Sequence, residues 1–133
     1  MTLKELLNDI DVLKINGDVS LPVSSVSYDS RRCAEGGVFV AVSGLREDGN
    51  RFVEDALARG VRFVVSEKDL AVPPGISTVQ VRNSREALGI LGRNFFGNPS
   101  ARLCLIGITG TNGKTTVSYL LESIFRAAGH SVG

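Results

Sequence analysis

Residues 105–116 read LIGITGTNGKTT, a glycine-rich segment between an apolar run and an amphipathic run. The apolar run ends at Ile108 and the amphipathic run begins at Lys114, which predicts a strand, a loop and a helix in that order. This order is the context in which backbone N–H groups and a helix N-terminus bind phosphate. Gly110 and Gly113 lack a Cβ, so the backbone can turn tightly and approach phosphate oxygens. The segment therefore predicts a nucleotide-phosphate loop.

Two side chains of this loop suit nucleotide chemistry. The Lys114 ammonium would reach the outer phosphates, and the Thr115 hydroxyl would complete a Mg²⁺ coordination sphere. The general phosphate-loop pattern has a glycine five residues before Gly113, where this chain has Ile108. The alternative is a glycine-rich turn before an ordinary helix N-terminus. The order of strand, loop, Lys-Thr and helix favours the nucleotide site.

The composition describes an ordinary globular chain. Its 133 residues are 43% hydrophobic and 22% charged, enough for one domain with its own core. A net charge of +1 gives no electrostatic reason to expect nucleic acid or an anionic membrane as a partner. No apolar stretch is long enough to span a bilayer, and the N-terminus lacks the apolar run of a signal peptide.

The cysteines and the single histidine carry little functional signal. Cys33 and Cys104 are far apart and lack metal-ligand spacing. Cys104 lies in the apolar run, so we expect a buried free thiol there. Unpaired cysteines favour a reducing cytoplasm. His130, near the C-terminus, is expected on the surface.

Residues 1–98 alternate short apolar runs with amphipathic ones, which predicts a small α/β domain. Thr2, Asn50 and Asn83 are the expected N-caps of its helices. For residues 12–20 we expect only a turn at Asn16-Gly17-Asp18. The expected helices span residues 2–8, 50–59 and 83–96, and the expected strands span 23–28, 38–42, 61–65 and 76–81.

Residues 99–133 form a second, shorter region. It contains an expected strand at 102–108, the loop, and a helix at 114–128 that stops at Gly129. An apolar strand of this kind is typical of a parallel sheet covered on both faces, and one helix cannot supply that cover. We therefore expect this chain to be an amino-terminal piece of a longer protein, cut inside its second domain. The alternative is a complete protein whose last helix packs on the first domain or on another copy.

The segment GTNGKTT after a strand resembles the ATP loop of the Mur ligases, which build the peptide of the bacterial cell wall. In that family the loop is written from the position of Gly110, so Ile108 is no departure. The blocks SYDSR, GGVFVAVSG, DGNRFV and AxxxGV resemble the first domain of the family in order and spacing, and with the loop they cover most of residues 23–128. They look most like the member that adds the third peptide residue. Gly37 and Asn50 stand where that pattern has Asp and His.

The resemblance implies that the first domain holds the UDP end of the substrate. Carried over by motif, Tyr28 and Ser30 would lie beside the uridine, and Leu45, Arg46 and Glu47 would form the loop after the FVA strand. A hydroxyl can hydrogen-bond a uracil edge, and an arginine suits a diphosphate. Without the resemblance, an Asx-type turn closed by its own side chain is the preferred interpretation of Asp29-Ser30-Arg31; with the resemblance, we prefer a ligand site.

The resemblance also implies the activity of an ATP-dependent amide ligase. ATP and the carboxylate of UDP-N-acetylmuramoyl-L-alanyl-D-glutamate would give an acyl phosphate, from which the amine of an amino acid displaces phosphate. Diaminopimelate and lysine both remain open as that amino acid. Lys114 would be catalytic and Thr115 would bind Mg²⁺. The ATP phosphates would lie on Gly110, Thr111, Asn112, Gly113, Lys114, Thr115 and Thr116.

Three alternatives stay open. The first is the family member that adds the terminal D-alanyl-D-alanine, which more often has Ser where Thr111 stands. The second is a generic phosphate-loop nucleotide-binding protein with an unrelated first domain. The third is a non-catalytic UDP-sugar-binding module in which the C-terminal unit serves only for packing or dimerisation.

Overall fold

The computed structural model describes residues 1–44 and 48–133, which form two compact units, Met1–Pro99 and Ser100–Gly133. The first unit contains a five-stranded sheet of order β1-β5-β4-β3-β2. Neighbours from β2 to β5 pair in parallel, whereas β1 pairs antiparallel with β5. The prediction of an α/β fold is confirmed. The strands are β1 (Val12–Asn16), β2 (Val26–Ser27), β3 (Val38–Ala41), β4 (Phe63–Ser66) and β5 (Ser77–Val81).

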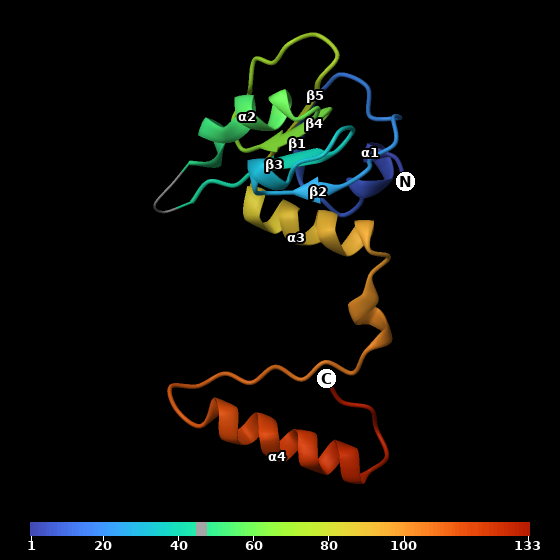
Figure 1. The fold of residues 1–133 in the computed structure, drawn as a ribbon, viewed down its shortest axis with the longest axis vertical. Helices are drawn as coiled ribbons and strands as arrows, with labels where there is room; N and C mark the ends of the chain where they lie inside the picture. Colours follow the sequence, from blue (N-terminus) through green and yellow to red (C-terminus); the bar gives the residue numbers. More distant parts are fainter. Residues whose placement is uncertain (45–47) are drawn as a thin grey trace. The chain divides into compact units, whose positions relative to one another are not determined.

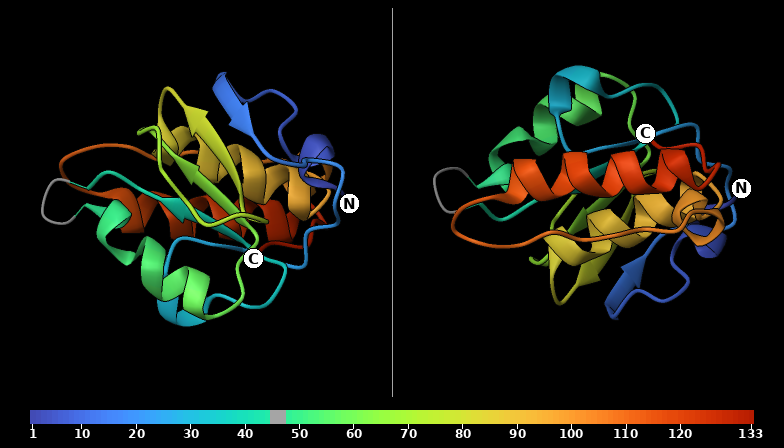
Figure 2. Two further views of the ribbon diagram at one scale, coloured as in Figure 1. Left: turned by 90° about the horizontal axis from the view of Figure 1, so that it is seen from above. Right: turned by 90° about the horizontal axis from the view of Figure 1, so that it is seen from below.

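Helices cover both faces of the sheet (Figures 1 and 2). On one face, α1 (Leu3–Leu6) and α3 (Ser84–Phe95) pack on the larger hydrophobic cluster. On the other face, α2 (Val53–Ala58) packs on the smaller cluster. Every residue of β3 and β4 is buried, as expected for parallel strands between two layers. Alternate β3 residues therefore belong to different clusters: Val38 and Val40 to the larger, Phe39 and Ala41 to the smaller.

The strand β1 contradicts the prediction of only a turn in this region. Val12 pairs with Val81 and Ile15 with Val79, with a register shift between Val12 and Lys14. The pairing joins residues more than 60 positions apart, so local pattern does not reveal it. Gly17 then turns the chain with φ 99°, where a Cβ would lie 2.6 Å from the Ser77 hydroxyl oxygen.

Two of the three expected helix caps are confirmed. Thr2 forms a capping box with Glu5, and the Asn83 side chain accepts hydrogen bonds from the Arg85 and Glu86 N–H groups at 3.1 Å. Asn50 is not an N-cap. Instead Asp48 accepts from the Asn50 N–H at 3.0 Å and caps a 3₁₀ turn, η2 (Gly49–Phe52), that leads into α2.

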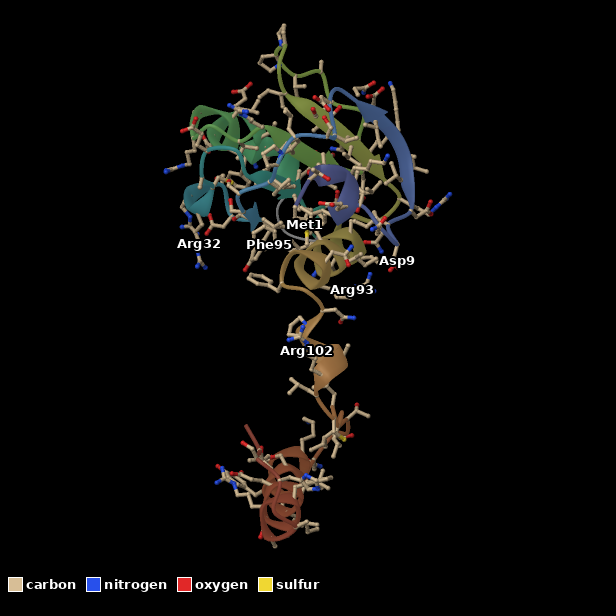
Figure 3. The ribbon with its side chains drawn as sticks, turned by 90° about the vertical axis from the view of Figure 1, so that its right-hand side faces the viewer. Met1, Asp9, Arg32, Arg93, Phe95 and Arg102 are labelled. Atoms are coloured by element: carbon tan, nitrogen blue, oxygen red, sulfur yellow. The ribbon has the colours of Figure 1, made fainter. Side chains whose placement is uncertain are left out.

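The helix α3 is also tied to the N-terminal segment by polar side chains. The Arg93 guanidinium donates to the Asp9 carboxylate at 2.6 Å (Figure 3). The Asn94 amide donates to the Leu6 and Asn8 carbonyls at 3.0 and 2.9 Å. These contacts join the C-terminal half of α3 to the end of α1 and to the residues that follow it.

The second unit contains α4 (Lys114–Ala127), which confirms the predicted helix, with Gly129 following it at φ 85°. The predicted strand at 102–108 is wrong: a 3₁₀ turn, η3 (Pro99–Arg102), precedes residues that form no strand. A strand needs a hydrogen-bonded neighbour, and no described strand pairs with this segment. Cys104 is consequently exposed rather than buried. His130 is exposed as expected.

Candidate functional site at the carboxyl edge of the sheet and the glycine-rich loop

The carboxyl ends of the parallel strands gather polar residues at one edge of the sheet. Tyr28 follows β2, Ser43 lies two residues beyond β3, and Glu67 follows β4. Ser84, the first residue of α3, comes soon after β5. In open α/β sheets, ligands bind in the crevice outside these carboxyl ends. This edge is therefore the candidate site of the first unit.

The structure places Tyr28 and Ser30 at this edge in different environments. Tyr28 is 67% exposed and can offer its ring to a ligand, whereas Ser30 is only 7% exposed. Asp29 caps the short turn η1 (Ser30–Arg32) by accepting from the Arg31 N–H at 3.0 Å. The Arg31 guanidinium contacts both Asp29 oxygens at 2.9 Å and holds the pKa of that carboxyl below its usual value. The Asx-type turn is thus present and orders the segment that contains both residues.

The predicted substrate residues Leu45, Arg46 and Glu47 lie outside the described residues. The residues on either side of them are joined by backbone hydrogen bonds. Ser43 and Asp48 form an antiparallel bridge, and the Gly49 N–H donates to the Val42 carbonyl at 3.0 Å.

Glu67 and Ser84 hold the Ser43 side of this segment. The Ser84 N–H and hydroxyl both donate to one Glu67 oxygen, at 2.9 and 2.7 Å. The Ser43 N–H in turn donates to the Ser84 hydroxyl oxygen at 3.2 Å. The hydrogen bonds from Ser84 lower the pKa of the Glu67 carboxyl, so it is ionised at neutral pH.

Asp48, on the other side of this segment, accepts hydrogen bonds from two side chains. The Lys68 ammonium donates to it at 2.6 Å, and the Asn50 amide at 2.5 Å. These hydrogen bonds, with Lys68 the largest contributor, lower the pKa of Asp48 to about 2. The Ser66 hydroxyl donates to Asn50 at 2.6 Å and thereby orients the amide. The sequence analysis assigned no site role to these polar groups, although Ser43 and Ser66 directly follow predicted strands and Ser84 lies in the first turn of a predicted helix.

In the second unit the glycine-rich loop leads directly into α4. Gly110 and Gly113 have φ 153° and 76°, conformations that favour glycine. Gly113 is the N-cap, and because glycine has no side chain it cannot cap the helix N–H groups. The Val117 N–H donates to the Gly113 carbonyl at 2.9 Å, which is the first hydrogen bond of the helix. The N–H groups of residues 114–116 therefore have no partner within the helix. They are suited to bind an anion at the positive end of the helix dipole.

The Lys114 ammonium folds back over the loop and donates to the Gly110 carbonyl at 2.5 Å. Its positive charge thus lies on the loop that leads into the free N–H groups, and an ammonium with backbone N–H groups is a donor set that suits a polyphosphate. Thr115 lies exposed in the first turn of α4, and its carbonyl accepts from the Ser118 hydroxyl at 2.7 Å. One hydroxyl supplies one ligand of the six that Mg²⁺ requires. Among the described residues no three His, Cys, Asp or Glu side chains gather as a metal site.

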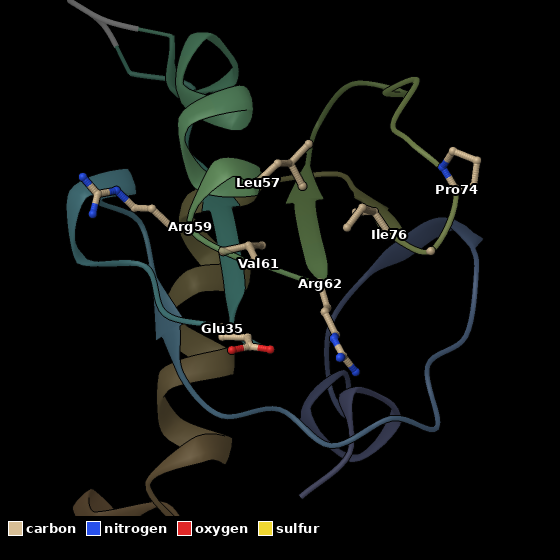
Figure 4. A pocket seen from close by; sticks show the side chains of 9 residues that line it. Glu35, Leu57, Arg59, Val61, Arg62, Pro74 and Ile76 are labelled. Atoms are coloured by element: carbon tan, nitrogen blue, oxygen red, sulfur yellow. The ribbon is translucent and has the colours of Figure 1, made fainter.

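A shallow hollow of about 500 Å³ lies near the amino-terminal ends of β4 and β5 (Figure 4). Leu57, Val61 and Ile76 contribute its apolar lining. Arg59 and Arg62 extend to different sides of it, so their charges do not converge. None of the residues that the sequence assigns to a ligand lines this hollow. It is therefore separate from the candidate site.

A family model described as "Mur ligase family, catalytic domain" matches residues 22–96, which include the carboxyl edge described above. The chain belongs to the Mur ligase family. The resemblance of its sequence motifs to that family is thereby confirmed.

Curated relatives extend the similarity across the whole chain. The UDP-N-acetylmuramoyl-L-alanyl-D-glutamate--2,6-diaminopimelate ligase of Clostridium perfringens is 41% identical over 133 residues, covering 100% of this chain and 28% of its own length. The ligase of the same name from Bacteroides fragilis is 39% identical over 134 residues, again covering 100% and 28%. The chain thus spans slightly more than a quarter of the length of these relatives.

Solved Mur ligase structures share the fold. A UDP-N-acetylmuramoyl-L-alanyl-D-glutamate--2,6-diaminopimelate ligase structure has a TM-score of 0.72 and 26% identity, over 98% of this chain and 26% of that one. The MurF ligase of Thermotoga maritima in complex with ADP has a TM-score of 0.58 and 31% identity, over 79% and 24%. No helix in the part of the chain that the structure describes is long and apolar enough to cross a membrane.

Proposed function

We propose that this chain is the amino-terminal part of an ATP-dependent ligase that joins diaminopimelate to UDP-N-acetylmuramoyl-L-alanyl-D-glutamate. The observation that carries the proposal is the loop from Gly110 to Lys114, whose ammonium lies over the loop at the start of α4. This loop lies in a chain whose full length matches ligases of that name. Relatives between 36% and 41% identical share the name, which favours this reaction over addition of D-alanyl-D-alanine.

In this proposal residues 1–98 form the UDP-substrate-binding domain. Exposed Tyr28 contacts the uridine with its ring, and Ser30 lines the same end through the ordered turn at Asp29. Leu45, Arg46 and Glu47 supply the remaining contacts, with Arg46 suited to the diphosphate. The position of Tyr28 and Ser30 directly after β2, at the carboxyl edge of the sheet, supports this assignment.

Residues 99–133 begin the central ATP-binding domain. The N–H groups of residues 110–116 bind the phosphates, and Lys114 exchanges the Gly110 carbonyl for a phosphate oxygen. Thr115 contributes its hydroxyl to Mg²⁺, which neutralises charge on the phosphates. ATP supplies the phosphoryl group that activates the substrate carboxylate as an acyl phosphate, and the amine of the amino acid then displaces phosphate. The cytoplasm, where ATP is available, is the proposed location.

The test is a ligase assay on the intact protein that contains this chain, with product mass and phosphate release as readouts. We expect phosphate release that requires UDP-N-acetylmuramoyl-L-alanyl-D-glutamate, ATP, Mg²⁺ and diaminopimelate together, and little release with lysine. The chain of 133 residues alone should form no amide bond. Phosphate release without the UDP compound would instead favour a generic nucleotide-binding protein. A product that contains D-alanyl-D-alanine would favour the other ligase.

A further inference from the structure

Two consecutive turns, each closed by a side chain, hold the chain where β2 ends. In the first turn, the Ser27 hydroxyl accepts from the Asp29 N–H at 3.1 Å and donates to the Asp29 carbonyl at 2.9 Å. In the second turn, the Asp29 carboxylate accepts from the Arg31 N–H at 3.0 Å. Tyr28 is the middle residue of the first turn, and Ser30 is the middle residue of the second. The two residues proposed to contact the uridine therefore each lie inside a turn closed by a side chain.

Both residues that flank Tyr28 are held in place. Ser27 pairs with Phe39 of β3 in the sheet. Asp29 is held by the Ser27 hydroxyl, and its carbonyl also accepts from the Arg32 N–H at 3.0 Å. Tyr28 thus lies between a strand residue and a turn residue. The short ring that the Ser27 hydroxyl closes restricts the φ and ψ angles of Tyr28.

The Tyr28 ring depends on this backbone support because it has little packing of its own. It is 67% exposed, and it belongs to neither hydrophobic cluster of the described residues. The backbone φ and ψ angles decide which rotamers a side chain can adopt. An exposed ring on a restricted backbone therefore samples fewer orientations than the same ring on a free chain.

We infer that Ser27 is a positioning residue for the UDP-substrate, which, with Asp29 as its anchor, holds Tyr28 at the carboxyl edge before the ligand arrives. This inference rests on the proposed function, which assigns Tyr28 to the uridine. Ser27 does not need to touch the ligand. Its effect is to order the backbone of Tyr28 in advance, so that binding does not bear the entropic cost of ordering it.

The test compares Ser27→Ala with Ser27→Thr by calorimetric titration of this chain with UDP-N-acetylmuramoyl-L-alanyl-D-glutamate. Alanine removes the hydroxyl that holds both backbone groups of Asp29, whereas threonine retains a hydroxyl. We expect Ser27→Ala to weaken binding about five- to tenfold, which corresponds to ordering one backbone residue, and Ser27→Thr to stay within about twofold. Amide exchange at Asp29 should accelerate in Ser27→Ala but not in Ser27→Thr.

A double-mutant cycle tests whether Ser27 acts through Tyr28. We expect Tyr28→Ala alone to weaken binding. In the chain that already carries Tyr28→Ala, Ser27→Ala should then weaken binding by no more than about twofold, because no ring remains to be positioned. An equal loss in both backgrounds, or a Tyr28→Ala variant that binds as tightly as the wild type, would refute the positioning role.

Ser77→Ala is the matched control. The Ser77 hydroxyl also donates to a backbone carbonyl, that of Asp18, at 2.9 Å, but it lies at the amino-terminal end of β5. We expect this variant to lower the melting temperature without changing affinity or amide exchange at Asp29. If Ser27→Ala binds as tightly as the wild type, or if Ser77→Ala weakens binding equally, the positioning role is wrong while the proposed function stands. If the wild-type chain itself binds no UDP compound, the proposed substrate site fails, and the positioning role with it.

Discussion

Replacement of Gly49 by alanine tests how closely the chain packs at the carboxyl edge of the sheet. A Cβ at Gly49 would lie 2.7 Å from both the nitrogen and the oxygen of Val42, and 3.0 Å from the Ala41 carbonyl carbon. All three are backbone atoms, so no side chain can rotate away. Ordinary contact begins at 3.4 Å, which means that the backbone must separate by about 0.7 Å.

The expected cost combines two opposing effects. Overpacking of this kind destabilises by about 1–3 kcal/mol, and the lower entropy of the unfolded chain with alanine offsets about 0.4–1 kcal/mol of it. The net loss in the free energy of unfolding is therefore about 1–2 kcal/mol. For a unit of this size that corresponds to a fall in melting temperature of roughly 5–15 °C. The shift should also lengthen the hydrogen bond from the Gly49 N–H to the Val42 carbonyl.

Gly89→Ala is the control for this prediction. Gly89 lies within α3, and a Cβ there would meet no heavy atom within 4 Å. Alanine should therefore stabilise the helix by about 0.5–1 kcal/mol. Urea denaturation followed by circular dichroism measures both variants. If Gly49→Ala is as stable as the wild type, the close approach of Gly49 to Val42 is not a feature of the folded protein.

Three further predictions address the core, the carboxylates and the loop. Leu91→Ala should lower the free energy of unfolding by about 2–5 kcal/mol in the same assay, because Leu91 is fully buried in the larger cluster. The pKa values of Asp48 and Glu67 are lower in the folded state than in the unfolded state. The contribution of these two carboxylates to the free energy of unfolding is therefore complete above their unfolded pKa values, near 4, and is lost as the pH falls toward about 2. Acid titration followed by circular dichroism measures this loss. Asp48→Asn should flatten that acid transition. Lys114→Ala should weaken binding of ATP with Mg²⁺ about 10- to 100-fold in calorimetry and leave affinity for the UDP compound unchanged.

Features that depend on neighbouring residues could be predicted from the sequence. The cap at Asn83, the capping box at Thr2 and the helix after Lys114 all follow from contacts within a few positions. The strands β3 and β4 could also be predicted, because burial on both faces leaves a run that is apolar except for Ser66 at the end of β4.

Features that depend on distant partners could not be predicted in this way. The strand β1 forms because β5 offers an edge, with Asn16 opposite Thr78. The expected strand at 102–108 lacks any described neighbour, so its apolar residues alone do not make a strand. Asn50 is a residue type that often caps helices, but its side-chain amide donates to Asp48 and its amide oxygen accepts from Ser66 instead.

The candidate site shows the same division. The loop from Gly110 to Thr115 is recognisable because its chemistry is contiguous in sequence. The hydrogen-bonded chain from Glu67 through Ser84 to Ser43 joins three separate segments and emerges only when the sheet is assembled. The burial of Ser30 beside exposed Tyr28 likewise follows from the turn at Asp29 rather than from composition.

The most direct test of the account is calorimetric titration of this chain with UDP-N-acetylmuramoyl-L-alanyl-D-glutamate, with ATP and Mg²⁺ as a second titrant. The account predicts saturable binding of the UDP compound by the first unit, whether or not the short second unit also binds ATP. Well-folded protein that binds ATP but not the UDP compound would contradict the assignment of the carboxyl edge as a UDP-substrate site.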